Sequence, residues 1–226
     1  MGFFDRIKRM FGKAAPVAPQ YDEQEAQKWH DHKSKLMERS LGKEHDMVMH
    51  AMIPFAIGGG LDLYYYPNGT IPGTAIATKE LSNTATHGST NDLYTTYEMV
   101  MFTRHALDLD AAKDESTDFG KAHGNINGIM NPLARYSGMA KLNSNETSEF
   151  PEDFGNGFGG KCFIFDGYAT HSDTSDENAT FGLLAIIEIF RSELEFARKH
   201  GGAKLIQELK TAGHYPYSDL DREAVA

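Results

Sequence analysis

The sequence predicts a single α+β domain in which a mixed, largely antiparallel sheet is flanked by helices. Two observations carry this prediction. Short runs rich in β-branched and aromatic residues recur through the middle of the chain, separated by turn-forming segments, as expected for strands joined by hairpin-like connections. Helical patterns lie before and after that middle region. The 226 residues divide into an N-terminal segment with its linker, 1–20, and the domain itself, 21–226.

The N-terminal segment is basic and amphipathic. A helix over Met1–Lys13 would separate its phenylalanines from its Arg and Lys side chains, which suits peripheral contact with an anionic membrane surface. Docking of this short helix on the body of the protein is the alternative, because short isolated helices are marginal. A Pro/Ala linker, Ala14–Gln20, follows. Within Asp22–Leu41 apolar residues recur at helical spacing, and Gly42 is a plausible stop.

A glycine-rich stretch, His50–Asn68, raises the question of a phosphate site. Phosphate-binding loops place a helix directly after their glycines. Here a run of strand formers follows instead, and no Lys-Ser/Thr pair is present. We therefore interpret Pro54, Gly58, Gly59 and Gly60 as a structural turn that carries the chain into a strand.

The strand after this turn supplies the candidate contact residues. Asp62, Tyr64 and Tyr66 alternate along it with Leu63 and Tyr65, so the two sets face opposite sides of the sheet. Tyrosine combines apolar area with a polar tip, and an edge strand can accept an added strand from a peptide. We expect Asp62, Tyr64 and Tyr66 to contact a partner. The alternative is that the tyrosines close the sheet against a helix.

The remaining strands are less regular. Apolar or β-branched runs predict strands at Thr74–Thr78, Leu93–Phe102, Lys161–Phe165 and Phe181–Phe190. The region Asp108–Phe154 is rich in Asn, Gly, Ser and acidic residues. It predicts long loops with room for a helix, which the pattern does not place.

Two helices are expected near the C-terminus. The pattern Ser192–Glu195 matches a capping box, in which the Ser hydroxyl and the Glu carboxylate satisfy free N–H groups at a helix start. This helix is expected to end near His200, before a pair of glycines. A second helix over Ala203–Ala212 ends at Gly213, the position that favours glycine after a helix.

Composition limits the function. A net charge of −10 argues against a nucleic-acid binder, which would show a basic face, and is compatible with a basic protein or peptide partner. No stretch reaches the roughly 18 apolar residues of a membrane span, and the start of the chain lacks the apolar centre of a secretory signal. The single cysteine, Cys162, excludes an internal disulfide, so a cytoplasmic location is expected. Its apolar neighbours indicate a buried structural thiol.

No catalytic or metal-binding constellation is evident. His30 and His32 would lie on different faces of a helix. The stretch His171–Glu177 has no recognised zinc spacing, and Asp108–Asp118 has Lys113 where a calcium loop requires glycine. There is no G-x-S-x-G motif. The sequence thus indicates no metal and no cofactor. A competing hypothesis from another class is a metal-dependent hydrolase that uses His87, His123 or His171 with nearby acids.

Several segments together resemble the suppressor of fused domain. The opening strands carry the first part of the likeness, in His50, Ile53, Pro54, Phe55, Ile57, Gly58, Gly59, Leu61, Asp62, Tyr64, Tyr66 and Pro67. Two strand ends continue it at Ala77–Ser82 and Tyr97–Met101. The closing strand, helices and tail complete it, in Ile186, Ile189, Glu193, Glu195, Phe196, Ala197, Gly201, Leu205–Leu209, Asp219, Asp221 and Arg222. The likeness runs from about His45 to Arg222, with Lys79 and Glu80 standing where many members have glycine.

This resemblance implies a non-catalytic protein-binding module. The related animal protein clamps a peptide strand of a transcription factor between two lobes, and this chain matches one lobe. Bacterial members of the family resemble immunity proteins that neutralise toxins. An acidic inhibitor would suit a basic nuclease through electrostatic complementarity. The identity of the partner and the oligomeric state are open.

Overall fold

One mixed sheet organises the part of the chain that the computed structural model describes, residues 22–155, 157–172, 174 and 176–226. The expectations for Met1–Lys13 and for the linker Ala14–Gln20 lie outside these residues. The strand order is β1-β2-β3-β4-β7-β6-β5. The strands are β1 (Val48–Met49), β2 (Leu63–Pro67), β3 (Thr74–Ala77), β4 (Thr96–Thr103), β5 (Thr147–Glu149), β6 (Cys162–His171) and β7 (Phe181–Ile189).

All neighbouring strands of this sheet pair antiparallel except one pair at its centre. The antiparallel pairs are β1–β2, β2–β3, β3–β4, β5–β6 and β6–β7. Strands β4 and β7 run parallel, with Thr96 opposite Phe181. Their connection contains α3 (Asp118–Ser137), β5 and β6, because parallel neighbours need a crossover. The predicted α+β class with a mixed, largely antiparallel sheet is confirmed.

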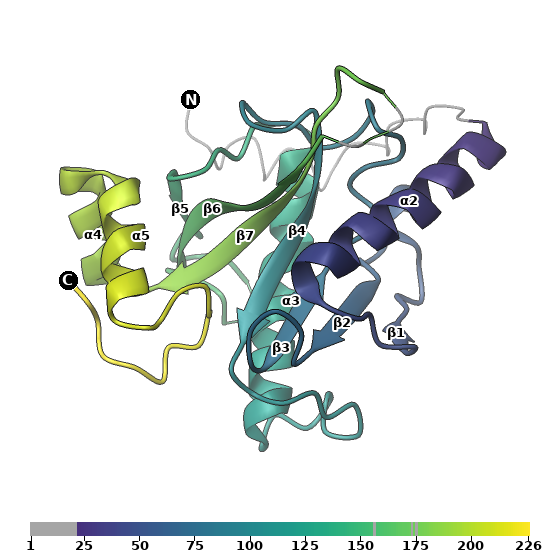
Figure 1. Ribbon diagram of the computed structural model, residues 1–226. Helices are drawn as coiled ribbons and strands as arrows, with labels where there is room; N and C mark the ends of the chain where they lie inside the picture. The colour runs from purple at the N-terminus through teal and green to yellow at the C-terminus, as the bar shows by residue number, and fades with distance from the viewer. Residues whose placement is uncertain (1–21, 156, 173, 175) are drawn as a thin grey trace.

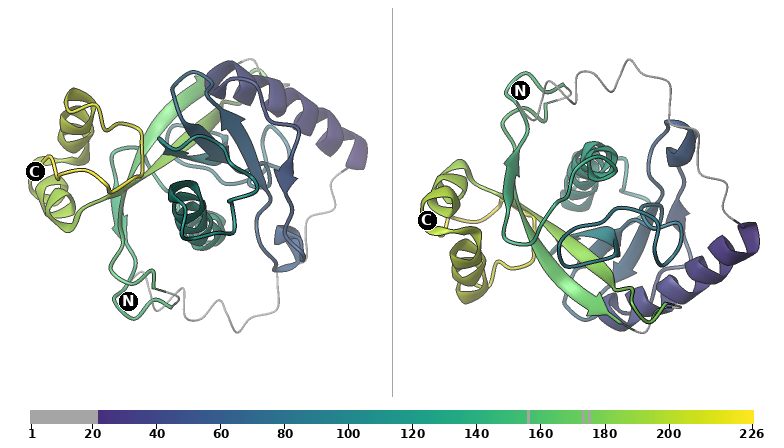
Figure 2. Two further views of the ribbon diagram at one scale, coloured as in Figure 1. Left: turned by 90° about the horizontal axis from the view of Figure 1, so that it is seen from below. Right: turned by 90° about the horizontal axis from the view of Figure 1, so that it is seen from above.

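Helices cover both faces of the sheet (Figure 1). Helix α2 (Glu23–Leu41) lies on one face, and α4 (Arg191–His200) with α5 (Gly202–Thr211) lies at the other end of that same face. Helix α3 packs on the opposite face. Figure 2 shows the sheet curving around α3, with α2 and the α4–α5 pair outside it. None of the described helices is long and apolar enough to cross a bilayer.

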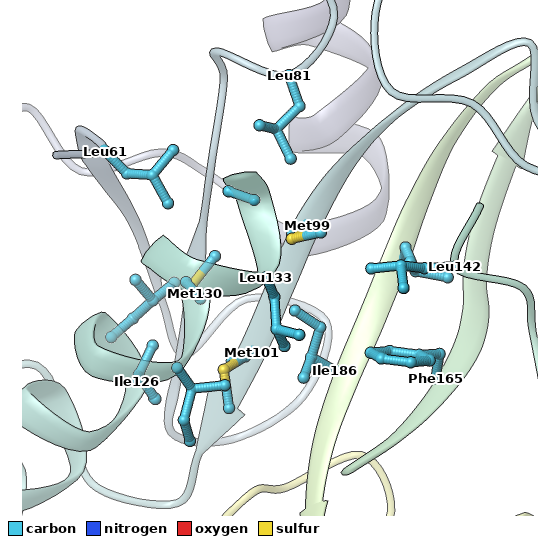
Figure 3. Close-up of a cluster of buried hydrophobic side chains, with 14 of the residues drawn as sticks. Leu61, Leu81, Met99, Met101, Ile126, Met130, Leu133, Leu142, Phe165 and Ile186 are labelled. Atoms are coloured by element: carbon cyan, nitrogen blue, oxygen red, sulfur yellow. The ribbon is translucent and has the colours of Figure 1, made fainter. Parts of the chain in front are cut away.

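The largest apolar cluster lies between α3 and the sheet (Figure 3). Met99 and Met101 of β4 and Ile186 of β7 meet Met130 and Leu133 of α3 there, and all five are buried. The even and odd positions of β2 separate as expected for a strand. Leu63 and Tyr65 belong to this cluster, whereas Tyr64 and Tyr66 belong to the cluster beneath α2.

Helix α2 is fixed to the sheet by a buried ion pair. The Lys33 ammonium lies 2.8 Å from Glu98 Oε1, and the exposed fractions of the two side chains are 2% and 0%. The Glu98 carboxylate also accepts hydrogen bonds from the hydroxyls of Thr78 and Ser82 and from the backbone N–H of Leu81 and Ser82. Burial raises the pKa of Glu98, but Lys33 and these donors outweigh it and lower that pKa below its usual value. Each charge is therefore paired, as burial requires.

Helix α3 is the main element that the sequence did not place. It contains three glycines, three asparagines and an internal proline, Pro132, so its intrinsic helix propensity is low. Its start is capped by Thr117, whose hydroxyl accepts the N–H of Gly120 at 3.0 Å. Buried apolar side chains such as Phe119, Ile129 and Leu133 hold it against the sheet. Tertiary packing, which the local sequence does not reveal, stabilises this helix.

Two local predictions need correction. The capping box at Ser192 is wrong, because α4 starts at Arg191 and Glu193 Oε2 accepts the N–H of Phe190 at 2.9 Å. Strand β6 extends to His171, beyond the predicted end, because it pairs along its length with β7. The helix over 22–41 and the two C-terminal helices are confirmed.

Candidate functional site

Exposed apolar side chains concentrate beside the edge strand β1. Large hydrophobic residues are exposed at six described positions, and four of them fall between residues 47 and 57. These four form what we call the β1 patch: Met47 (59% exposed), Met52 (fully exposed), Ile53 (57%) and Ile57 (69%). Such a concentration within eleven residues of sequence differs from the single exposed hydrophobic residues that are normal on protein surfaces.

The loop that carries the β1 patch has a defined backbone. A short 3-10 helix, η1 (Phe55–Ile57), begins after Pro54 and ends at Gly58, which adopts a left-handed φ of 98°. The next residue, Gly59, passes so close to the loop's own backbone that an added Cβ would lie 1.7 Å from the Ile53 carbonyl oxygen. The chain therefore folds tightly here, and glycine is required for steric reasons.

Helix α3 supports this loop from the core side. The Arg135 guanidinium donates to the carbonyl oxygens of Phe55 and Gly59 and lies 4.1 Å above the Phe55 ring. Asn131 Oδ1 accepts the N–H of Leu61 at 2.9 Å. Met52, Ile53 and Ile57 of the β1 patch thus lie on a loop that side chains of α3 hold in place.

Asp62 positions the other end of the same loop. Its carboxylate accepts the N–H of Ala51 at 2.9 Å and lies 2.7 Å from the exposed His50 ring. The N–H of Asp62 donates in turn to Glu80 Oε2 at 2.8 Å. Burial raises the pKa of Glu80 to about 7, against the lowering effect of this hydrogen bond. Asp62, one of the expected contact residues, therefore acts on the shape of the loop.

The two tyrosines of the predicted contact set lie on the α2 side of the sheet. Tyr64 is half-buried, with the Lys79 ammonium 4.6 Å above its ring. Tyr66 has an exposed fraction of 1%, and its hydroxyl donates to Glu44 Oε2 at 2.8 Å. Tyr66 is thus a core residue in this structure and offers no surface to a partner. Asp62 and Tyr64 are partly exposed, so the expected set of three is reduced to two accessible residues.

A shallow, open depression has His45, two residues before Met47 of the β1 patch, in its lining. Its volume is about 600 Å³, and its lining comes from the segment 105–110, the start of α3 and His45. Leu107, Leu109 and Phe119 supply apolar surface. The charged residues of the lining are Asp108, Asp110 and Asp118, beside His45 and His105.

The histidines considered for a hydrolase do not converge. His123 is buried. Its Nε2 lies 2.9 Å from the Tyr65 hydroxyl, and its Nδ1 lies 2.9 Å from the Ala112 carbonyl oxygen. His87 contacts hydroxyls within its own loop, and His171 Nε2 lies 2.9 Å from Ser40 Oγ. Among the described residues no three His, Cys, Asp or Glu side chains are grouped so that they could hold a metal ion.

Sequence reasoning missed the exposed residues of the β1 patch. The sequence predicts a turn at Pro54, Gly58, Gly59 and Gly60, but an apolar run does not show which of its side chains face solvent. One signal was available. A short apolar run that contains Pro54 and is closed by three glycines favours a loop over a strand, and loops run over the surface.

These features define an α+β domain with a seven-stranded mixed sheet and an exposed apolar patch at one edge strand. Its fold is that of suppressor of fused. A chain of the Sufu–Fu complex crystal structure superposes with a TM-score of 0.57 over 89% of this chain and 92% of the other, at 14% sequence identity. The crystal structure of Drosophila Suppressor of Fused gives a TM-score of 0.57 over 91% of this chain, at 15% identity.

The match covers only 54% of the Drosophila chain, so this protein spans about half of that relative. No protein-family model matches the sequence, and no curated protein matches it. The expected suppressor of fused likeness is therefore confirmed at the level of the fold, through structure.

Proposed function

We propose that this protein is a non-catalytic protein-binding module of the suppressor of fused type, and that the β1 patch is its contact surface. The observation that carries the proposal is the concentration of exposed Met and Ile side chains on a loop held by Arg135, Asn131 and Asp62. An exposed apolar surface is unfavourable in water unless a partner covers it. The fold, shared with a chain of the Sufu–Fu complex, supports the same class of function.

Asp62 remains a functional residue, but it holds the loop in shape, whereas the sequence predicted that it would contact the partner. It shapes the loop through Ala51 and His50. Tyr64 packs on the α2 face of the sheet, whereas the loop is held by α3 on the opposite face. We therefore expect Tyr64 to contribute little direct contact with the partner. A cytoplasmic location and a basic partner belong to the same proposal.

A neutralising inhibitor of a basic toxin is a second candidate function. The observation that favours it is the net charge of −10, together with three aspartates in the depression beside the patch. Opposite charge on the partner would accelerate association and make it sensitive to salt.

The decisive experiment compares partner recovery by matched variants. The tagged wild-type protein, an Ile53→Asp plus Ile57→Asp variant and a Leu93→Asp plus Met139→Asp variant are purified from the host. Leu93 and Met139 are exposed to a similar degree, 49% and 48%, and lie outside the segment 47–57. We expect one stoichiometric partner, identified by mass spectrometry, that the first variant loses and the second retains. Retention by both variants would contradict the assignment of the surface.

A further inference from the structure

We propose that the partner of the β1 patch presents an apolar–cationic segment, whose apolar side chains cover the patch and whose Lys or Arg enters the acidic depression beside it. This inference rests on the proposed protein-binding function and specifies the chemistry of the partner.

The patch and the depression meet at one point of the chain. His45 lines the depression, and its N–H donates to the Tyr65 carbonyl at 2.8 Å at the end of the β1–β2 pairing. Two residues later, the N–H of Met47 donates to His45 Nδ1 at 3.1 Å. The exposed Met47 is therefore hydrogen-bonded through its backbone to a residue that lines the depression.

Both surfaces also rest on the same core. Met49 of β1, Phe55 of the loop, and Leu107 and Leu109 of the depression all pack against the cluster beneath α3. One packed cluster thus sets the relative positions of the patch and the depression. A partner segment can engage both without a rearrangement of the domain.

The apolar wall and the carboxylates of the depression together favour a Lys or Arg side chain. Its apolar wall suits the methylene stem of Lys or Arg, and its carboxylates suit the cationic head, since these side chains bury the stem while the charge stays hydrated. Among the residues that the structure describes, no Lys or Arg lines the depression to compete for Asp108, Asp110 or Asp118. The exposed Asp46 extends the negative charge to the base of the patch.

The net charge of the protein favours a cationic peptide segment over an anionic membrane surface or a second copy of this chain. The protein carries a net charge of −10, so an anionic membrane surface or a second copy of this chain would bring like charges together. A segment with apolar residues beside Lys or Arg satisfies the patch and the depression at once.

The test uses a library of short random peptides displayed on phage, selected on the folded full-length protein. Binders are then measured against three variants: Ile53→Asp plus Ile57→Asp, Asp108→Asn plus Asp118→Asn, and the charge-matched control Glu23→Gln plus Glu25→Gln on the exposed start of α2. We expect the selected peptides to combine apolar residues with Lys or Arg. Their affinity should fall about tenfold or more with either of the first two variants, remain with the control, and decrease as salt is added.

The outcomes separate this inference from the proposed function. Peptides that need Ile53 and Ile57 but bind the aspartate variant unchanged, or that lack basic residues, would overturn the inference and leave the binding function intact. If no peptide distinguishes the wild type from the isoleucine variant, both fail. A concentration-dependent dimer in sedimentation that the isoleucine variant lacks would assign the patch to a second copy and overturn the inference.

Discussion

Arg222 and Glu193 form a buried, two-pronged ion pair that joins the C-terminal segment to the start of α4. Arg222 Nη1 lies 2.6 Å from Glu193 Oε1, and Nη2 lies 2.9 Å from Oε2. Their side chains are 3% and 0% exposed. Glu193 also accepts the N–H of Val225 and of Phe190. Burial raises the pKa of Glu193, but these donors outweigh it and hold the pKa below its usual value.

Removal of the arginine should strongly destabilise the domain. Arg222→Leu leaves the Glu193 carboxylate buried without its cation, so we expect the free energy of unfolding to fall by about 3–5 kcal/mol. Urea denaturation monitored by circular dichroism measures this change through the midpoint. The matched control is Lys141→Leu, because its pair with Asp92 is exposed on both sides and should contribute less than about 1 kcal/mol. Equal losses would contradict the argument.

Much of the fold follows from local sequence. Alternation along the chain predicts β2. Largely apolar or β-branched runs predict β4 and β7, because these two central strands are covered on both faces and all their residues are buried. Helix α2 follows from its period and from Gly42. Helix α3 does not, since its three glycines, three asparagines and one proline lower its helix propensity, and contacts with strands distant in sequence stabilise it. The tyrosines could be assigned to opposite faces, but which face α2 covers required the structure.

The candidate site could be predicted only in part. The turn through Pro54 and the glycines is predicted by the sequence, whereas Asp62 was expected to contact a partner and the structure shows it hydrogen-bonded to the loop. The exposure of Ile53 and Ile57 was not visible, because it depends on Arg135, which lies far along the chain and fixes the loop from α3. Burial of Tyr66 similarly depends on α2 and Glu44.

The Glu80 carboxyl should give the domain a pH dependence near neutrality. Its folded pKa of about 7 lies above the ordinary 4.5, so its contribution to stability is full below pH 4.5 and is lost as the pH rises to about 7. Glu80→Gln keeps an acceptor for the Asp62 N–H and removes the charge. We expect this variant to be more stable than the wild type at pH 8, by up to about 3 kcal/mol, with the difference disappearing near pH 4.5.

Thermal unfolding across this pH range measures the difference. Glu25→Gln, on the exposed side of α2, is the control and should follow the wild type at every pH. A Glu80→Gln difference that stays constant with pH would show that the carboxyl is not protonated preferentially in the folded state.

Gly59 should tolerate no side chain. Gly59→Ala places a Cβ against the Ile53 backbone, where the nearest atom lies 1.7 Å away, so the loop must open. We expect a loss of more than about 2 kcal/mol in stability and faster proteolysis within residues 50–60. Gly155→Ala, where an added Cβ meets nothing within 4 Å, serves as the control and should change little. An unaffected proteolysis rate for Gly59→Ala would refute the tight-turn geometry.

Cys162 should be unreactive in the folded protein. Burial raises the pKa of its thiol, although the nearby Arg191 lowers it, and the thiolate is the reactive form. We expect modification by a disulfide reagent such as DTNB to require unfolding, with a rate that follows the urea transition. Rapid stoichiometric reaction in native buffer would show that the thiol is accessible.

The parallel pairing of β4 with β7 has a consequence for biosynthesis. All residues of β4 are buried in the finished sheet, yet its parallel neighbour is made only after α3, β5 and β6. A nascent chain that ends before β7 carries an apolar strand whose hydrogen-bonding edge has no partner, which invites aggregation. The central pairing of this sheet therefore forms only after β7 has left the ribosome.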